Sequence, residues 1–170
     1  MGKCDLAMVT LEQLNLRLHY NPDNGIFTYI IPVAQMRPGD IAGRPNGNGH
    51  IQISINNRRY MAHNLAWLYM TGEMPDGFIV DHKNRVYDDN RWNNLRKANL
   101  SENCGNSKYY KNNTSGYKGV YFKKSAGKFV AQLTNGSKRI HLGYFDTAEA
   151  AHAVYSAAAI NYFGKDFANV

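Results

Sequence analysis

The sequence is poor in the features that mark secreted and membrane-embedded proteins. It contains only two cysteines, Cys4 and Cys104, which are too few and too far apart for a disulfide framework or a CxxC zinc site. No apolar run reaches the roughly 18 residues that span a membrane. Residues 1–5 also lack the basic-then-apolar pattern of a secretory signal. We therefore expect a soluble protein of the cytoplasm, with no membrane partner and no structural zinc.

Acidic residues are missing from one long stretch, between Asn103 and Phe145. The same stretch holds eight basic residues among Tyr and Phe side chains: Lys108, Lys111, Lys118, Lys123, Lys124, Lys128, Lys138 and Arg139. Basic residues that cluster among aromatic ones are typical of nucleic-acid-binding surfaces. A solvated basic face without a partner is the alternative explanation.

The chain does contain enough apolar material for folded domains. Its 170 residues are 44% hydrophobic and include 12 Tyr, 7 Phe and 2 Trp, so a core can form. This length fits one ordinary domain or two small ones. A polar segment without periodicity, residues 105–116, has the composition of a linker and predicts two domains.

The last third has the clearest pattern. Strand-forming runs at 118–123, 128–134 and 138–145 are separated by turn residues at 125–127 and 135–137. A helix follows, with Asp146 and Thr147 at its start, many alanines in its body and Gly164 at its end. These runs predict a three-stranded antiparallel sheet packed on one helix.

Strand alternation assigns the two faces of this sheet. The apolar residues Phe129, Ala131, Leu133, Ile140 and Leu142 must face the helix. The opposite, open face then carries these polar residues: Lys128, Gln132, Thr134, Arg139 and His141. A polar, basic sheet face suits a reader of the DNA major groove, although a solvated face is also normal for an antiparallel sheet.

The first two-thirds predict a mixture of helices and strands, and therefore an α+β protein. The expected elements are a short helix at 10–18, strands at 26–31, 51–55 and 59–61, and a buried helix at 62–71. A further strand ends in Asp81 and His82, and an Asn/Asp-rich loop leads to a strand at 95–98. We expect Ser101 to cap the next helix, which carries Asn103.

Asp81, His82 and Asn103 are the residue types that phosphodiester hydrolysis requires. A carboxylate and an amide oxygen are hard donors that suit Mg²⁺ or Mn²⁺ and leave coordination positions open. A histidine titrates near neutrality and could take a proton from the attacking water. Polar residues at a strand end also serve as turn formers, so the pattern alone leaves both explanations open.

At these residues the chain resembles the His-Asn-His (HNH) endonucleases of phage and homing type, in the variant whose last motif position is Asn. The similarity rests on Asp81-His82, Asp89-Asn90-Arg91, Asn94-Leu95-Arg96 and Glu102-Asn103, together with the upstream segment 60–67. Downstream, Ser115–Val120, Leu142–Phe145 and the Ala-rich helix resemble the plant Apetala or ethylene-response-factor DNA-binding domain. That module occurs fused behind HNH nucleases.

The resemblance implies a ββα-metal (His-Me finger) nuclease domain at 1–107, with its core at about 78–107, a linker at 108–115 and a DNA-binding domain at 116–170. It implies that Asp81 and Asn103 ligate one divalent cation, Mg²⁺ or Mn²⁺, that His82 is the general base, and that Asn94 holds the loop. It implies double-stranded DNA as the partner, a bacterial host cell as the location, and no organic cofactor. The implied DNA-contacting residues are Lys118, Tyr121, Lys123, Gln132, Thr134, Arg139 and His141.

Other assignments stay open at this stage. The chain could be a non-enzymatic DNA-binding regulator whose HNH fold is a relic, or a basic protein that binds RNA or polyanions. The sequence does not choose between nicking and double-strand cleavage, or between monomer and dimer. His63 could support the catalytic site, but a packed helix histidine is the expectation, because a lone histidine on a buried helix usually belongs to the core.

Overall fold

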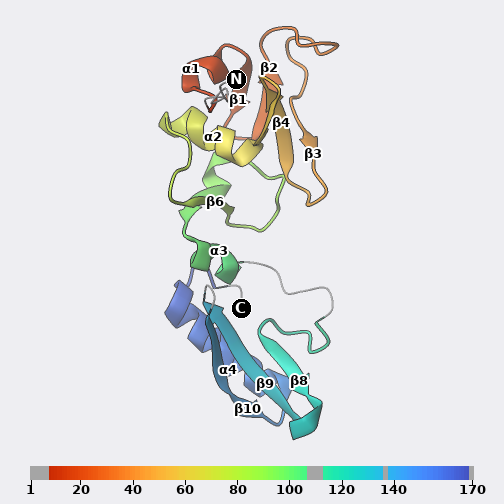
Figure 1. Cartoon of the computed structure of the whole chain (residues 1–170), viewed down its shortest axis with the longest axis vertical. Coiled ribbons are helices and arrows are strands. Elements are labelled where there is room, and N and C mark those ends of the chain that lie inside the picture. The colour runs from red at the N-terminus through yellow and green to blue at the C-terminus, as the bar shows by residue number, and fades with distance from the viewer. Residues whose placement is uncertain (1–7, 107–112, 136–137, 169–170) are drawn as a thin grey trace, which may run out of the picture. The chain divides into compact units, whose positions relative to one another are not determined.

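The structure is a computed structural model that describes residues 8–106, 113–135 and 138–168 (Figure 1). Most of the expected linker and part of the expected turn at 135–137 therefore lie outside the described residues, as do Cys4, Lys108 and Lys111. Internal contacts divide the chain into two compact units, Met1–Arg96 and Lys97–Val170. The helices that the structure describes include none with the length and apolar character to cross a bilayer.

The first unit combines short helices with small antiparallel sheets. Its elements are α1 (Leu11–Asn15), β1 (Leu18–Asn21), β2 (Ile26–Tyr29), β3 (Arg44–Pro45), β4 (Ile51–Ile55), β5 (Arg58–Met61), α2 (Ala62–Thr71), β6 (Ile79–His82) and the 3₁₀ turn η1 (Trp92–Asn94). Strands β1 and β2 form one hairpin, β3, β4 and β5 form a three-stranded sheet, and β6 pairs with β7 (Leu95–Ala98). The division between the units falls inside β7.

Local sequence explains the boundaries of several of these elements. Helix α2 covers the predicted residues and ends at Gly72, whose positive φ of 83° closes the helix by a hydrogen bond to the carbonyl of Leu68. Strands β4 and β5 meet at Asn56 and Asn57, both with positive φ, as a tight two-residue hairpin requires.

The expected helix at 10–18 was too long. Helix α1 ends at Asn15, and residues 18–21 form strand β1, which pairs with β2. In β1, Leu18 and Tyr20 are buried while His19 is exposed. The run that alternates between buried and exposed residues is short, so its sequence does not distinguish a strand from the end of a helix. The pairing with β2 stabilises residues 18–21 as a strand.

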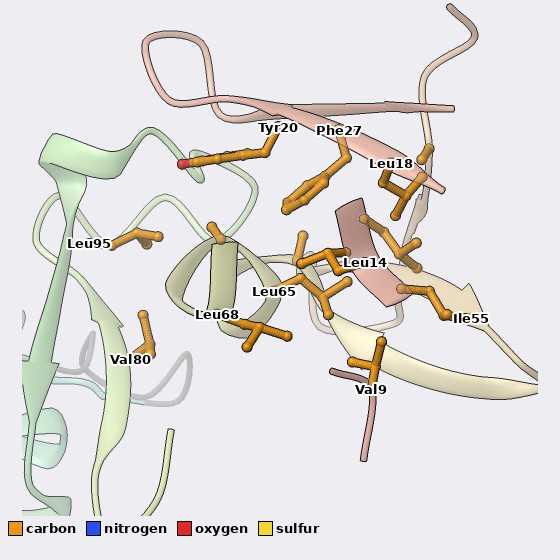
Figure 2. Close-up of a cluster of buried hydrophobic side chains, with 14 residues drawn as sticks. Val9, Leu14, Leu18, Tyr20, Phe27, Ile55, Leu65, Leu68, Val80 and Leu95 are labelled. Atoms are coloured by element: carbon orange, nitrogen blue, oxygen red, sulfur yellow. The ribbon is translucent and has the colours of Figure 1, made fainter. Parts of the chain in front are cut away.

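One hydrophobic core holds the first unit together (Figure 2). Leu14, Leu18, Phe27 and Leu65 are almost completely buried and come from α1, β1, β2 and α2. The cluster also contains Val80 of β6 and Leu95 of β7. The hairpin that carries Asp81 and His82 is therefore fixed to the core by its apolar residues.

The second unit contains the predicted three-stranded antiparallel sheet packed on one helix. Its elements are α3 (Leu100–Asn106), β8 (Val120–Lys123), the 3₁₀ turn η2 (Lys124–Ala126), β9 (Lys128–Asn135), β10 (Lys138–Phe145) and α4 (Ala148–Phe163), with strand order β10-β9-β8. Thr147 caps α4 by accepting a hydrogen bond from the Ala150 N–H. Ala151 and Ala159 are almost completely buried, so small side chains let α4 lie close to the sheet.

Helix α3 differs from expectation in its cap and in its packing. Asn99, not Ser101, caps it: the Asn99 side chain accepts from Glu102 N, and the Glu102 carboxylate accepts from Asn99 N. The helix packs within the second unit, where a Cβ on Gly105 would lie 2.7 Å from the Phe163 ring. The Lys118 ammonium donates to the Gly105 carbonyl at 2.6 Å, close to the negative end of the helix.

Candidate active site

Asp81 and His82 end strand β6, and both are buried, with 7% and 3% of their surfaces exposed. The Asp81 carboxylate forms an ion pair with Arg96 of β7. Its Oδ2 atom accepts from Arg96 Nε at 2.8 Å and lies 2.8 Å from Nη2. A buried carboxylate needs a positive partner, and in this structure Arg96 is one.

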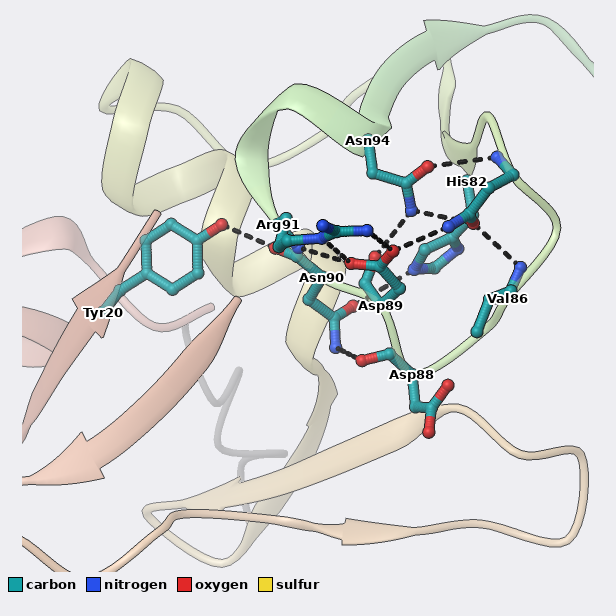
Figure 3. Close-up of polar contacts among 9 residues, drawn as sticks. Tyr20, His82, Val86, Asp88, Asp89, Asn90, Arg91 and Asn94 are labelled. Atoms are coloured by element: carbon teal, nitrogen blue, oxygen red, sulfur yellow. Dashed lines mark hydrogen bonds and ion pairs between the residues drawn. The ribbon is translucent and has the colours of Figure 1, made fainter. Parts of the chain in front are cut away.

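The ring of His82 is oriented by Asn90 (Figure 3). His82 Nε2 lies 3.1 Å from Asn90 Oδ1, while Asn90 Nδ2 donates to the Asp88 carbonyl at 3.1 Å. The second bond fixes the direction of the amide. Because the amide oxygen can only accept, Nε2 must carry the proton. The lone pair of a neutral His82 is therefore on Nδ1, which makes Nδ1 the basic nitrogen of the ring.

Asn90 is itself held by the β1–β2 hairpin. The Tyr20 hydroxyl donates to the Asn90 carbonyl at 2.6 Å across seventy positions of sequence. The turn of the hairpin lies so close that a Cβ on Gly25 would be 2.4 Å from Arg91 N. The N-terminal hairpin therefore supports the loop that orients His82.

Asn94 spans the same loop. Its amide nitrogen donates to Asn84 Oδ1 at 3.0 Å and to the Asp89 carbonyl at 2.7 Å, and its Oδ1 accepts from Asn84 N at 3.0 Å. Asp89 also pairs with Arg91 at 2.6 Å, and hydrogen bonding from Arg91 lowers the pKa of Asp89 to about 2. Asn94 thus has the contacts of a residue that holds the loop.

Asn103 lies on α3 in the second unit and is half-buried. Its backbone N–H donates to the Asn99 carbonyl at 3.0 Å, within the first turn of the helix. Joint metal ligation by Asp81 and Asn103 stays a prediction.

Two further histidines lie beside His82, and the sequence analysis assigned neither to the site. The ring centroids of His63 and His82 are 5.0 Å apart, those of His50 and His63 5.4 Å, and those of His50 and His82 5.9 Å. Burial lowers the pKa values of all three rings, with mutual repulsion adding to the effect for His50 and His63, and that of His63 falls to about 3. His50 follows a Gly-rich loop, and nothing in its sequence neighbourhood marks it.

The open face of the second unit's sheet carries most of the predicted DNA-binding residues. Cross-strand pairs place Arg139 opposite Thr134, His141 opposite Gln132, and Lys123 opposite Lys128. Tyr121 is 45% exposed. Three of the predicted cations have protein partners among the described residues: Lys128 pairs with Asp146 at 2.6 Å, Lys118 donates to the Gly105 carbonyl, and Lys123 donates to the Tyr144 hydroxyl.

Tyr144 also belongs to this face, and alternation alone misses it. A bulge between His141 and Gly143 shifts the register of β10 by one residue, which brings Tyr144 opposite Val130 on the open face. Tyr144 is 48% exposed and its hydroxyl lies 2.8 Å from Lys123 Nζ. The face therefore presents two tyrosines among its cations.

Together, these features define a two-part protein, in which a hairpin with a buried histidine precedes a basic sheet packed on a helix. Residues 60–104 match the HNH endonuclease family, and residues 115–165 match the AP2 domain. Protein 3.8 of Escherichia phage T7 is 30% identical over 93 residues, which are 55% of this chain and 77% of that protein. The chain belongs to the HNH endonuclease family and carries an AP2 domain behind the HNH region.

Two other comparisons cover smaller parts. APETALA2-like protein 2 of Oryza sativa is 38% identical over 53 residues, or 31% of this chain, and the match spans only 12% of the rice protein. A solved structure titled "DNA binding and cleavage by the HNH homing endonuclease I-HmuI" aligns with a TM-score of 0.40 and 17% identity, over 52% of this chain and 49% of that one.

Proposed function

We propose that this protein is a divalent-metal-dependent endonuclease that hydrolyses phosphodiester bonds in double-stranded DNA, of the homing or phage HNH type. The observation that carries the proposal is the buried His82, whose Nε2–H is donated to Asn90 Oδ1, so that the lone pair of the neutral ring is on Nδ1. Family membership and the AP2 domain support DNA as the substrate.

In the proposed reaction, His82 Nδ1 takes a proton from the water that attacks the phosphate. Asn90 fixes the tautomer, and Asn94 holds the loop that carries Asn90. The resulting products would be a 5′-phosphate and a 3′-hydroxyl, as in the family.

Asp81 and Asn103 would hold the cation, and their oxygen donors fit Mg²⁺ or Mn²⁺. When bound, the cation would act as a Lewis acid that stabilises the negative charge developing on the phosphate. Asp81 is buried and paired with the Arg96 guanidinium, so a cation held there would have to share or replace this ion pair.

Metal removal tests this proposal. With Mg²⁺ or Mn²⁺, the chain should cleave a DNA library that contains its target, and EDTA should reduce cleavage to background. DNA affinity in a mobility-shift assay should change less than about twofold, because the AP2 sheet needs no metal. Sequencing the ends would identify the site and the strand preference. Cleavage that persists in EDTA would refute the metal dependence.

A DNA-binding regulator with a relic HNH fold is the second candidate. The Arg96 ion pair favours it, because Arg96 balances the charge of Asp81 without a metal. Under this assignment, the protein would bind its target in the library specifically in every buffer. It would not cleave the DNA with any divalent cation.

DNA binding itself should depend strongly on salt. If about four cations of the second unit contact phosphates, the log–log slope of affinity against salt should be near −4, at roughly −0.9 per contact. Arg139→Gln should make the slope shallower by about one. Lys165→Gln, which removes an exposed lysine beyond α4, is the matched control and should leave it unchanged. A slope near zero for the wild type would contradict phosphate contacts.

A further inference from the structure

Three of the six histidines of the chain converge on one point in the first unit. His50 precedes β4, His63 lies in the first turn of α2 and His82 ends β6. Each offers one ring nitrogen, and these three atoms all lie within 4.8 Å of one another. Elements that are distant in sequence thus bring three donors of a single type together.

The environment of each ring is that of a metal ligand. His82 donates its Nε2–H to the amide oxygen of Asn90, and metal-bound histidines characteristically donate their second nitrogen in this way. His63 is only 8% exposed, and its Nδ1 is buried without a hydrogen-bond partner among the described residues. His50 stacks on the ring of Tyr87, with centroids 4.5 Å apart and planes at 10°.

The donor set selects the kind of cation. Imidazole nitrogens favour Zn²⁺, Ni²⁺, Co²⁺ and Cu²⁺, whereas Mg²⁺ and Mn²⁺ favour oxygen. Three histidines with one open position are a familiar tetrahedral zinc arrangement. Zn–N bonds of about 2.0–2.1 Å place ligating nitrogens roughly 3.3 Å apart, so the cluster must contract slightly. His50 is half-buried at the end of a loop, so it can supply this movement.

We propose that His50, His63 and His82 form a site for a borderline transition-metal cation such as Zn²⁺, separate from the oxygen-donor site, and that its occupation inhibits the nuclease. The cation would take the lone pair that His82 needs to accept a proton. The inhibition rests on the proposed function of His82, whereas the binding does not.

Binding is tested first, on the full chain without DNA. Competition with a chromophoric zinc chelator should show tight binding by the wild type and a loss of about 100-fold or more for His50→Gln, since removing even an outer partner of a ligand costs 10–100-fold. The backbone groups of His50 make its hydrogen bonds to Asn46, so this variant keeps the loop. His19→Gln, at an exposed position of β1, is the matched control and should bind like the wild type.

Equal zinc affinity in all three proteins, or no binding by the wild type, would overturn the site. Cobalt supplies an independent check. Co²⁺ should give the visible absorption of a tetrahedral nitrogen site in the wild type and not in His50→Gln. A strong thiolate-to-cobalt charge-transfer band would assign binding to Cys4 or Cys104 and would also overturn it.

Inhibition is tested second, with Mg²⁺ in excess. Each protein is compared with its own zinc-free rate. Zinc at a level that fills the site should reduce cleavage at least tenfold in the wild type and in His19→Gln, and much less in His50→Gln. Bound zinc without inhibition would refute the inhibitory role alone. If the wild type never cleaves DNA, the proposed function is refuted. The zinc-binding measurements would still decide whether the three-histidine site exists.

Discussion

Replacing His82 with alanine should reduce the rate of DNA cleavage by about 10²–10⁴-fold, the usual contribution of a positioned base, with DNA affinity close to that of the wild type. The expectation follows from the hydrogen bond that commits Nε2 to Asn90 and leaves Nδ1 as the accepting nitrogen. Single-turnover cleavage with saturating protein would measure the chemical step separately from binding.

Added imidazole distinguishes a base from a structural residue. His82 is buried, so alanine leaves a space that a free imidazole can enter, and part of the lost rate should return as imidazole is added. His19→Ala, at an exposed position, should cleave like the wild type and gain nothing from imidazole. Full activity of the His82→Ala protein would contradict the assigned role.

Replacing Gly119 with alanine should strongly destabilise the second unit. Gly119 has a φ of 70°, and a Cβ there would lie 2.1 Å from the Tyr155 ring and 2.8 Å from the Gln132 carbonyl. Left-handed backbone costs a non-glycine residue about 1–2 kcal/mol, and displacing a packed ring adds about 1–3 kcal/mol. We expect the free energy of unfolding to fall by about 3 kcal/mol and DNA binding to fall with it.

Gly127→Ala separates the two contributions. Gly127 also has a positive φ, 63°, but a Cβ there would meet nothing within 4 Å, so only the backbone strain should appear, at about 1 kcal/mol. Urea unfolding followed by circular dichroism would compare the two variants. If both variants lost the same free energy of unfolding, Tyr155 and β9 would have to move aside at no cost. That result would contradict the close packing described for α4.

The sequence pattern was sufficient to predict those elements whose bounds are set by neighbouring residues. Helix α2 has the predicted bounds, because an apolar helix ended by Gly72 is a complete signal in itself. Strand β7 also has the predicted bounds. The strand-loop-strand-helix order around Asp81 and His82 was also recoverable, and the two-part architecture follows from motifs that are contiguous in sequence.

What the sequence could not show depends on long-range contacts. Asn90 is one of several asparagines in its loop, and only the fold turns its amide toward His82. His50 becomes notable only when β4 packs beside α2 and β6. The bulge in β10 has no marked signal before Gly143, so strict alternation left Tyr144 off the open face.

The packing of α3 governs how this protein can be divided. Gly105 contacts Phe163 and Lys118, so the helix that carries the last motif position belongs to the half with the AP2 domain. A cut in the linker, the place suggested by composition, would strip α3 of these neighbours and expose its Gly105 surface. A fragment that keeps α3 in its packed form should therefore include the AP2 half.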